Sequence, residues 1–135
     1  MSSHGRRLRP PSGGTPPADT ARVQGDQLLF LAPLAHEAAL WHQAEFPDEV
    51  ERYGRAGFAW CVHDLQYVLG WAARDEASPG LLERELAWLT RLLDARGYDI
   101  RRLARSLELL GDVVAERHPG ADDLARRLRA AANGV

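Results

Sequence analysis

Apolar side chains recur at intervals of three and four residues from about Asp26 onward, whereas residues 1–25 show no such period. These intervals place side chains on one face of an α-helix. Five segments share the pattern, and they lie within residues 26–43, 47–74, 78–97, 99–117 and 121–132. No alternating run of β-branched residues, the usual sign of a strand, is found in the sequence. The pattern therefore predicts an all-α fold of about five helices.

The third and fourth segments have the clearest end signals. Ser78 is an expected N-cap, Pro79 suits the first helical turn, and Gly97 suits the left-handed position that follows a helix. Asp99 is the expected N-cap of the fourth segment, which should stop at His118-Pro119-Gly120. The apolar stripes of the two segments are Leu82, Leu86, Leu89 and Leu93, then Ile100, Leu103, Leu107, Leu110 and Val114.

The first two segments contain residues that bend or break helices. Asp26 is a possible N-cap of the first, and Pro33 either kinks that helix or lies in the first turn of a helix that begins just before it. Pro47 opens the second segment and suits its first turn. Gly54 and Gly57 each weaken this helix by ~1 kcal/mol relative to alanine, so a bend or break is expected there.

Two regions differ in composition. Residues 1–25 hold four prolines and four glycines with few apolar side chains, which predicts a disordered tail. Residues 26–135 have the length and apolar content of one domain. The short connections between the predicted helices require neighbours that run in opposite directions. The expected architecture is an antiparallel helical bundle behind a disordered N-terminal tail.

Composition and charge narrow the class of protein further. Cys61 is the only cysteine, which excludes an intrachain disulfide, and its apolar neighbours indicate a buried thiol. No apolar stretch is long enough for a signal peptide or a membrane span, so a soluble, cytoplasmic protein is expected. Residues 1–25 have a net charge of +3 out of the total of −2, which leaves −5 for the rest. A body with that charge does not favour nucleic-acid binding.

Motifs for catalysis or metal binding are missing from the sequence. His36-Glu37 begins like the zinc motif His-Glu-x-x-His, but Leu40 stands where the second histidine would be. None of the later histidines follows a glutamate at the spacing of di-iron bundles. There is also no glycine-rich phosphate loop, no Gly-x-Ser-x-Gly and no Cys-x-x-Cys. The sequence predicts no catalytic residue and no metal ligand, and hence a protein that is not an enzyme.

One face of the second helix stands out. Trp60, His63, Asp64, Tyr67 and Trp71 follow one another at spacings of three and four, so they share this face. One interpretation is that the rings belong to the core and that His63 or Asp64 bonds a neighbouring element. The other is a partly polar surface on which rings stack a flat ligand or anchor a partner protein. Under the second interpretation at least one ring should border a pocket, with His63 or Asp64 near the opening.

The segment from Cys61 to Trp71, together with residues 81–114, resembles a bacterial helical module that precedes cobalamin-binding domains in regulators and sensors. The resemblance covers roughly residues 50–118. The residues that fit its pattern are Cys61, Asp64, Tyr67, Leu69, Trp88, Arg96, Gly97 and Leu107. Val68 stands where the pattern has histidine, so any function of that histidine would be missing here. No cobalamin-binding sequence follows within the 135 residues.

Two functions follow from these observations. The resemblance implies a non-catalytic helical regulatory or protein-interaction module, with another protein as its partner, no cofactor, and a homodimer as an open alternative. The second function is a small-molecule sensor that holds a flat cofactor, a corrinoid or tetrapyrrole, on the aromatic face of the second helix. Neither function involves a membrane or a specific nucleic acid.

Overall fold

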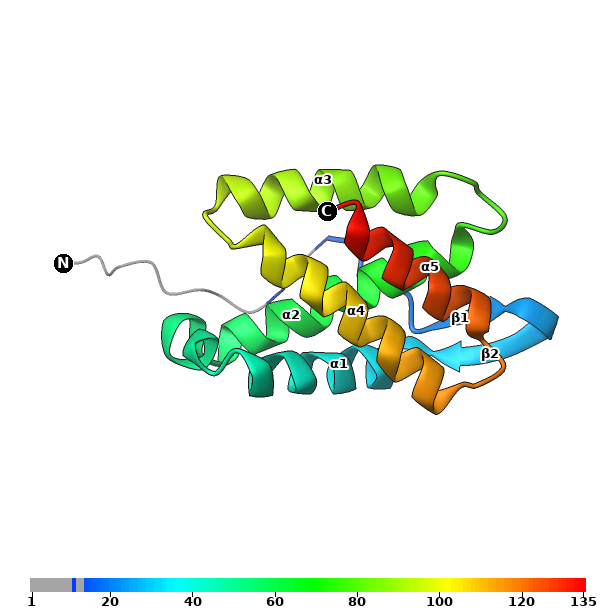
Figure 1. Cartoon of the computed structure of the whole chain (residues 1–135), viewed down its shortest axis with the longest axis horizontal. Helices are drawn as coiled ribbons and strands as arrows, with labels where there is room; N and C mark the ends of the chain where they lie inside the picture. Colours follow the sequence, from blue (N-terminus) through cyan, green and yellow to red (C-terminus); the bar gives the residue numbers. More distant parts are fainter. Residues whose placement is uncertain (1–10, 12–13) are drawn as a thin grey trace.

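The computed structural model describes residue 11 and residues 14–135 as a bundle of helices with one small β-hairpin (Figure 1). The helices are α1 (Leu31–Glu45), α2 (Asp48–Arg74), α3 (Leu81–Ala95), α4 (Ile100–Arg117) and α5 (Asp122–Asn133). Successive helices run in roughly opposite directions, because the connections between them are short. The prediction of an all-α helical bundle is confirmed.

The hairpin was not predicted. Strands β1 (Thr20–Val23) and β2 (Gln27–Phe30) pair antiparallel, and a short 3₁₀ turn, η1 (Gln24–Asp26), joins them. Gly25 and Asp26 both have a positive φ, as tight hairpin turns require. Each strand has only four residues, and of these only Val23 and Leu29 are buried. The alternation of buried and exposed side chains is therefore too short to predict strands from the sequence. Leu28 and Phe30 fit the apolar pattern of the helix that follows.

The hairpin corrects two boundaries. Asp26 lies in the hairpin turn and does not cap a helix, because α1 begins at Leu31 with Pro33 in its first turn. Residues 20–25, assigned to the tail, belong to the folded body. Residues 14–19 run along α2, where the Gln66 side chain donates a hydrogen bond to the Ala18 carbonyl at 2.8 Å. The rest of the predicted tail, residues 1–10 and 12–13, lies outside the described residues.

For α3, the predicted N-terminal cap is wrong and the predicted C-terminal glycine is confirmed. The helix begins after Gly80, and its N-terminal turn is capped by Asp75, whose Oδ1 accepts from the Leu82 N–H at 3.0 Å. Ser78 and Pro79 are therefore not its cap. At the other end Gly97 has φ 80°, as expected. The Tyr98 N–H donates to the Leu93 carbonyl at 3.0 Å, which turns the chain back sharply.

Helix α2 is interrupted where the glycines predicted a break. Gly54 has φ 64° and ψ −159°, a conformation open only to glycine. The six residues before it form a separate turn of helix, which Pro47 and Asp48 begin. This interruption sets the direction of Glu49 and Tyr53 relative to the long remainder of the helix.

The core lies between α2 and α4, with α1 packed on both and α5 packed on α4 (Figure 1). Its fully buried side chains include Leu65, Val68, Leu69, Leu107, Leu110, Val113 and Val114. Helix α4 begins at the predicted cap, since Asp99 Oδ1 accepts from the Arg101 N–H at 3.0 Å. Helix α3 covers one edge and buries only Leu82, Leu86 and Leu89.

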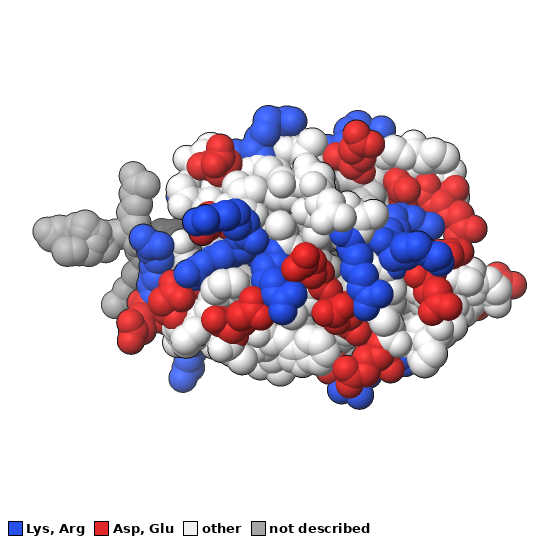
Figure 2. All heavy atoms as spheres, in the orientation of Figure 1, with Lys and Arg blue, Asp and Glu red and all other residues white. Residues whose placement is uncertain are grey.

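Arginines and carboxylates interleave on the face of the molecule that Figure 2 shows. Pairs that join different helices, each with a shortest N–O distance of 2.7 Å, are Arg105–Glu45, Arg117–Glu37 and Arg129–Asp112. Exposed pairs of this kind contribute little to stability, so their effect is to fix how the helices meet. Among the described residues, no helix is both long enough and apolar enough to cross a membrane.

Replacing Leu86 or Leu107 with alanine should destabilise the protein by ~2–5 kcal/mol each, because both truncations leave a void in the core. Leu107 is 0% exposed and Leu86 is 5% exposed. Urea unfolding measures the loss. Leu40→Ala is the control, since Leu40 is 45% exposed and should change stability by less than ~0.5 kcal/mol. Equal, small effects at all three positions would contradict the packing of α3 and α4 described here.

Candidate functional site

The aromatic side chains of α2 form a continuous row, which we call the aromatic row: Trp60, His63, Tyr67 and Trp71. Neighbouring ring centroids lie 5.1 Å, 5.0 Å and 5.8 Å apart along it. These separations are typical of edge-to-face and tilted aromatic pairs. The residues thus share one face of α2, as their spacing predicts.

The two ends of the aromatic row have different surroundings. Trp71 is only 8% exposed and belongs to the core. The Tyr67 hydroxyl donates a hydrogen bond to the Thr15 carbonyl, so the segment before β1 crosses the row at this point. The interpretation of these rings as core therefore holds for the Trp71 end.

The other end of the row opens into a cavity of about 240 Å³, which we call the Trp60 cavity. It lies between α2, the C-terminal end of α3 and the first half of α4. The residues that line it are Glu49, Tyr53, Gly57, Trp60, Cys61, Asp64, Leu65, Leu93, Arg96, Tyr98, Leu103 and Ser106. Two of the five predicted site residues, Trp60 and Asp64, are among them. His63 directly precedes Asp64 in the sequence, and its Nδ1 lies 3.2 Å from Asp64 Oδ1.

Local sequence explains how α2 forms this wall. Glu49 and Tyr53 precede the Gly54 break, and Gly57, Trp60 and Asp64 follow it. The break lets both parts of the helix face the same cavity. A side chain at Gly57 would collide with the Cβ atom of Tyr53, so this close approach requires glycine.

A polar network, which we call the Glu49 cluster, lies at one side of the cavity; its members are His42, Glu49, Tyr98, Arg102 and Ser106, of which Glu49, Tyr98 and Ser106 line the cavity. Glu49 Oε1 lies 3.0 Å from His42 Nε2. Glu49 Oε2 accepts from the Tyr98 hydroxyl and from Arg102 Nη1, both at 3.0 Å. An ionised carboxylate can only accept hydrogen bonds, so Nε2 is the protonated nitrogen facing it.

Burial opposes the ionisation of Glu49, but hydrogen bonds outweigh it. The bonds from His42 and Arg102, and then that from Tyr98, hold the pKa of this carboxyl below its ordinary value. Glu49 is therefore a negative charge on the inner side of the cavity. Its side chain is only 15% exposed, so water screens this charge weakly.

Ser106, His42 and Glu49 have the composition of a catalytic triad but not its arrangement. In Ser-His-Asp hydrolases the histidine Nε2 faces the serine and Nδ1 faces the carboxylate. Here Nδ1 lies 3.0 Å from Ser106 Oγ, and Nε2 faces Glu49. The Ser106 hydroxyl also donates to the Arg102 carbonyl at 3.0 Å, and the residue is 4% exposed. This geometry favours a structural role.

Three other groups that line the cavity, Cys61, Tyr98 and Asp64, have raised pKa values. Burial first, then the nearby charges of Glu49 and Asp64, raise the pKa of the Cys61 thiol to about 12. Burial and the Glu49 charge raise the pKa of Tyr98. Burial also raises the pKa of Asp64, while the hydrogen bond from His63 and the charge of Arg96 oppose that effect. The raised pKa keeps Cys61 in the protonated form at neutral pH, although the residue is half-buried and not fully enclosed.

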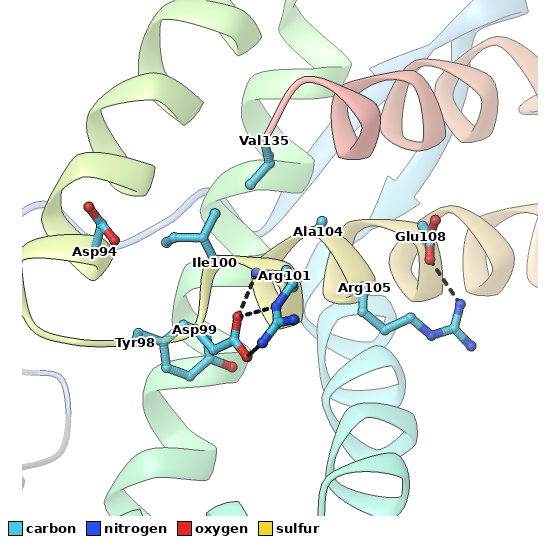
Figure 3. Close-up of a pocket in the computed structure, with 9 residues that line it drawn as sticks. All are labelled: Asp94, Tyr98, Asp99, Ile100, Arg101, Ala104, Arg105, Glu108 and Val135. Carbon is cyan, nitrogen blue, oxygen red and sulfur yellow. Dashed lines mark hydrogen bonds and ion pairs between the residues drawn. The ribbon is translucent and has the colours of Figure 1, made fainter.

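Two wider hollows lie elsewhere on the described surface. One of about 510 Å³ lies between the end of α3, the start of α4 and Val135, and Tyr98 lines it too (Figure 3). Four of its five charged side chains pair with near neighbours, Arg101 with Asp99 and Arg105 with Glu108 (Figure 3). The other, about 630 Å³, lies between α3 and α5. Neither brings several aromatic rings and buried polar groups together, so the Trp60 cavity is the better candidate site.

Comparison of the chain with protein-family models, with curated proteins and with solved structures finds no match. The resemblance to the module that precedes cobalamin-binding domains therefore stays a prediction. The described residues also contain no group of three or more His, Cys, Asp or Glu side chains placed to bind a metal ion.

The Glu49 cluster could not be predicted from the sequence. Glu49 follows Pro47 in the first turn of the second predicted helix, and His42 is one of the histidines with no glutamate three positions before it, so neither residue stood out. Tyr98 offered one usable signal, because it follows Gly97 directly and such a residue often packs back on the helix just ended. The partners of Tyr98 are 49 and 56 residues away in sequence, so its hydrogen bonds could not be predicted.

Tyr98→Phe should lower the free energy of unfolding by ~1–3 kcal/mol, because the variant keeps the ring and removes the donor to the Glu49 carboxylate. Thermal or urea unfolding measures this. Tyr53→Phe is the matched control, since no hydrogen bond of the Tyr53 hydroxyl is found within the described part of the chain. The control should change stability by less than ~0.5 kcal/mol. Equal effects of the two changes would mean that the Tyr98 hydroxyl does not stabilise the cluster.

Stability should fall as the pH drops through the carboxyl range, and Glu49 should contribute to the fall. Its pKa in the folded protein lies below the ordinary value of 4.5, so the unfolded chain takes up the proton first. The stabilisation present above the unfolded pKa is lost as the pH falls through the folded one. Urea unfolding from pH ~7 to ~3 should show a weaker pH dependence in Glu49→Gln. An unchanged dependence would mean that the charge of Glu49 does not stabilise the fold.

Proposed function

We propose that this chain is a non-catalytic regulatory module that binds a small organic ligand in the Trp60 cavity. The observation that supports this function is the convergence of Trp60, Asp64 and three members of the Glu49 cluster on one cavity of about 240 Å³. Small-molecule sites combine apolar and aromatic walls with a few polar groups that fix the orientation of the ligand. The Trp60 cavity has both kinds of wall.

The size of the cavity favours a ligand smaller than a corrinoid or a tetrapyrrole. Pockets for drug-sized molecules have volumes of roughly 300–1,000 Å³, and a cavity of roughly 150 Å³ holds a benzene molecule. A volume of about 240 Å³ therefore suits a molecule with one ring and a short substituent. A flat macrocycle would need open ring faces, but the segment of residues 15–18 crosses the aromatic row at Tyr67, and Trp71 is only 8% exposed.

The chemistry of the cavity walls supports binding without catalysis. Cys61 is held as the neutral thiol, and the Ser106 hydroxyl donates to a backbone carbonyl. Glu49 accepts three hydrogen bonds and is not placed as a free general base. A protein that binds a ligand and leaves it unchanged is suited to sensing.

A protein-interaction role is the second candidate, and Trp88 favours it. This residue lies on α3 and is 50% exposed, although tryptophan at an unoccupied surface is uncommon. Exposed tryptophans are frequent anchors of protein interfaces. A module of this kind can combine both roles, with the ligand in the cavity and another protein, or a second copy of the chain, on α3.

Single-ring compounds should bind in the Trp60 cavity and stabilise the protein. We suggest benzylamine, benzyl alcohol and benzoate, which share a ring and differ in charge. At a concentration of ~100 Kd a bound ligand adds ~2.7 kcal/mol to the free energy of unfolding. The Trp60 indole N–H resonance should shift on titration, because this side chain lines the cavity.

Cys61→Leu should abolish the binding without unfolding the protein, since the larger side chain fills part of the cavity. Val62→Leu is the matched control: it is the same kind of enlargement at the next residue, which does not line the cavity. If none of the three compounds shifts the Trp60 resonance or raises the melting temperature, the proposed function is wrong.

A further inference from the structure

The Trp60 cavity has two carboxylates in its wall. Glu49 is held by three hydrogen bonds, and an ionised carboxylate has about four acceptor positions, so one position of Glu49 remains for a ligand. Asp64 uses Oδ1 toward His63 Nδ1, and its Oδ2 accepts no hydrogen bond among the described residues. The cavity thus offers acceptors for a ligand that donates hydrogen bonds.

Aromatic rings form much of the remaining wall. Trp60, Tyr53 and Tyr98 line the cavity, and the centroids of the two tyrosine rings lie 6.3 Å apart. The faces of aromatic rings carry partial negative charge and attract cations, tryptophan most strongly. Rings and carboxylates together therefore favour a positively charged group.

Two titratable side chains respond to this negative field. The carboxylates of Glu49 and Asp64 add to the effect of burial in raising the pKa of Cys61. The charge of Glu49 likewise adds to the effect of burial in raising the pKa of Tyr98. Cys61 and Tyr98 lie on different elements of the wall, so the charge of Glu49 acts on both of these elements.

We infer that the ligand of the Trp60 cavity is a small organic cation, a protonated primary amine attached to an apolar group about the size of one ring. The inference rests on the proposed function and specifies its ligand. The ammonium group donates to Asp64 Oδ2 and to the remaining position on Glu49, and the apolar group packs on Trp60, Leu65 and Leu93. Arg96, the one cation among the lining residues, disfavours a ligand with a second positive charge.

Calorimetric titration with benzylamine, benzyl alcohol and benzoate tests whether the cavity prefers a positively charged ligand. Benzylamine is protonated at neutral pH, and it should bind at least ~10-fold more tightly than benzyl alcohol, because its ammonium group forms charged pairs with the carboxylates and has three donors, whereas the alcohol is neutral and has one. Benzoate should bind most weakly. If benzyl alcohol or benzoate binds as tightly as benzylamine, the inference is overturned while the proposed function stands. If no compound binds, both fail.

Variants of the wall distinguish an ammonium acceptor from a structural residue. Asp64→Asn should weaken benzylamine binding ~10-fold and leave benzyl alcohol binding unchanged. Asp94→Asn, on the exposed surface of α3, is the matched control and should affect neither compound. An equal loss for both compounds in Asp64→Asn would show that Asp64 only supports the shape of the site. Arg96→Gln, on the exposed rim, should strengthen benzylamine binding alone; no change there would also contradict the inference.

Discussion

The carboxylate of Glu49 is the point on which the arrangement of this protein depends. It lies on α2 and is bonded by His42 from α1, Tyr98 from the α3–α4 connection and Arg102 from α4. A charge with so little exposure is tolerated only when its hydrogen-bonding capacity is used, and removing one partner leaves the rest in a costly state. The helices must therefore meet in one register.

The Trp60 cavity follows from the same constraint. Apolar side chains cannot close over the Glu49 cluster without burying its polar atoms further, so the space between α2, α3 and α4 stays open beside it. The Gly54 break keeps Glu49 and Tyr53 on the wall, and Gly57 admits their close approach. Cavities with polar walls hold water or a ligand, whereas apolar ones can remain empty. A ligand that replaces such water must supply donors for the carboxylates, which is why an amine suits this site.

Local sequence signals predicted most of the fold. The features that were not predicted depend on interactions between residues that are farther apart in the sequence. Gly97, Asp99 and Gly54 act within their own turns, and each was placed correctly. The cap of α3 was missed because Asp75 reaches it from seven residues away. The hairpin was missed because Leu29 needs a partner strand to show which face is buried. The Glu49 cluster joins residues up to 64 positions apart, such as His42 and Ser106, and no periodicity contains that pairing.

The aromatic row shows the limit of reasoning from spacing alone. Intervals of three and four correctly placed Trp60, Tyr67 and Trp71 on one face, but they could not show what covers each ring. The cover comes from residues 14–19, which the composition assigned to a tail. Two prolines in this segment restrict its backbone, so ordering it costs less entropy than ordering a flexible chain. The segment occupies the face near Tyr67 and leaves Trp60 beside the cavity. The continuous row on this helix is thus divided into a core residue, Trp71, a covered residue, Tyr67, and one wall of the cavity, Trp60.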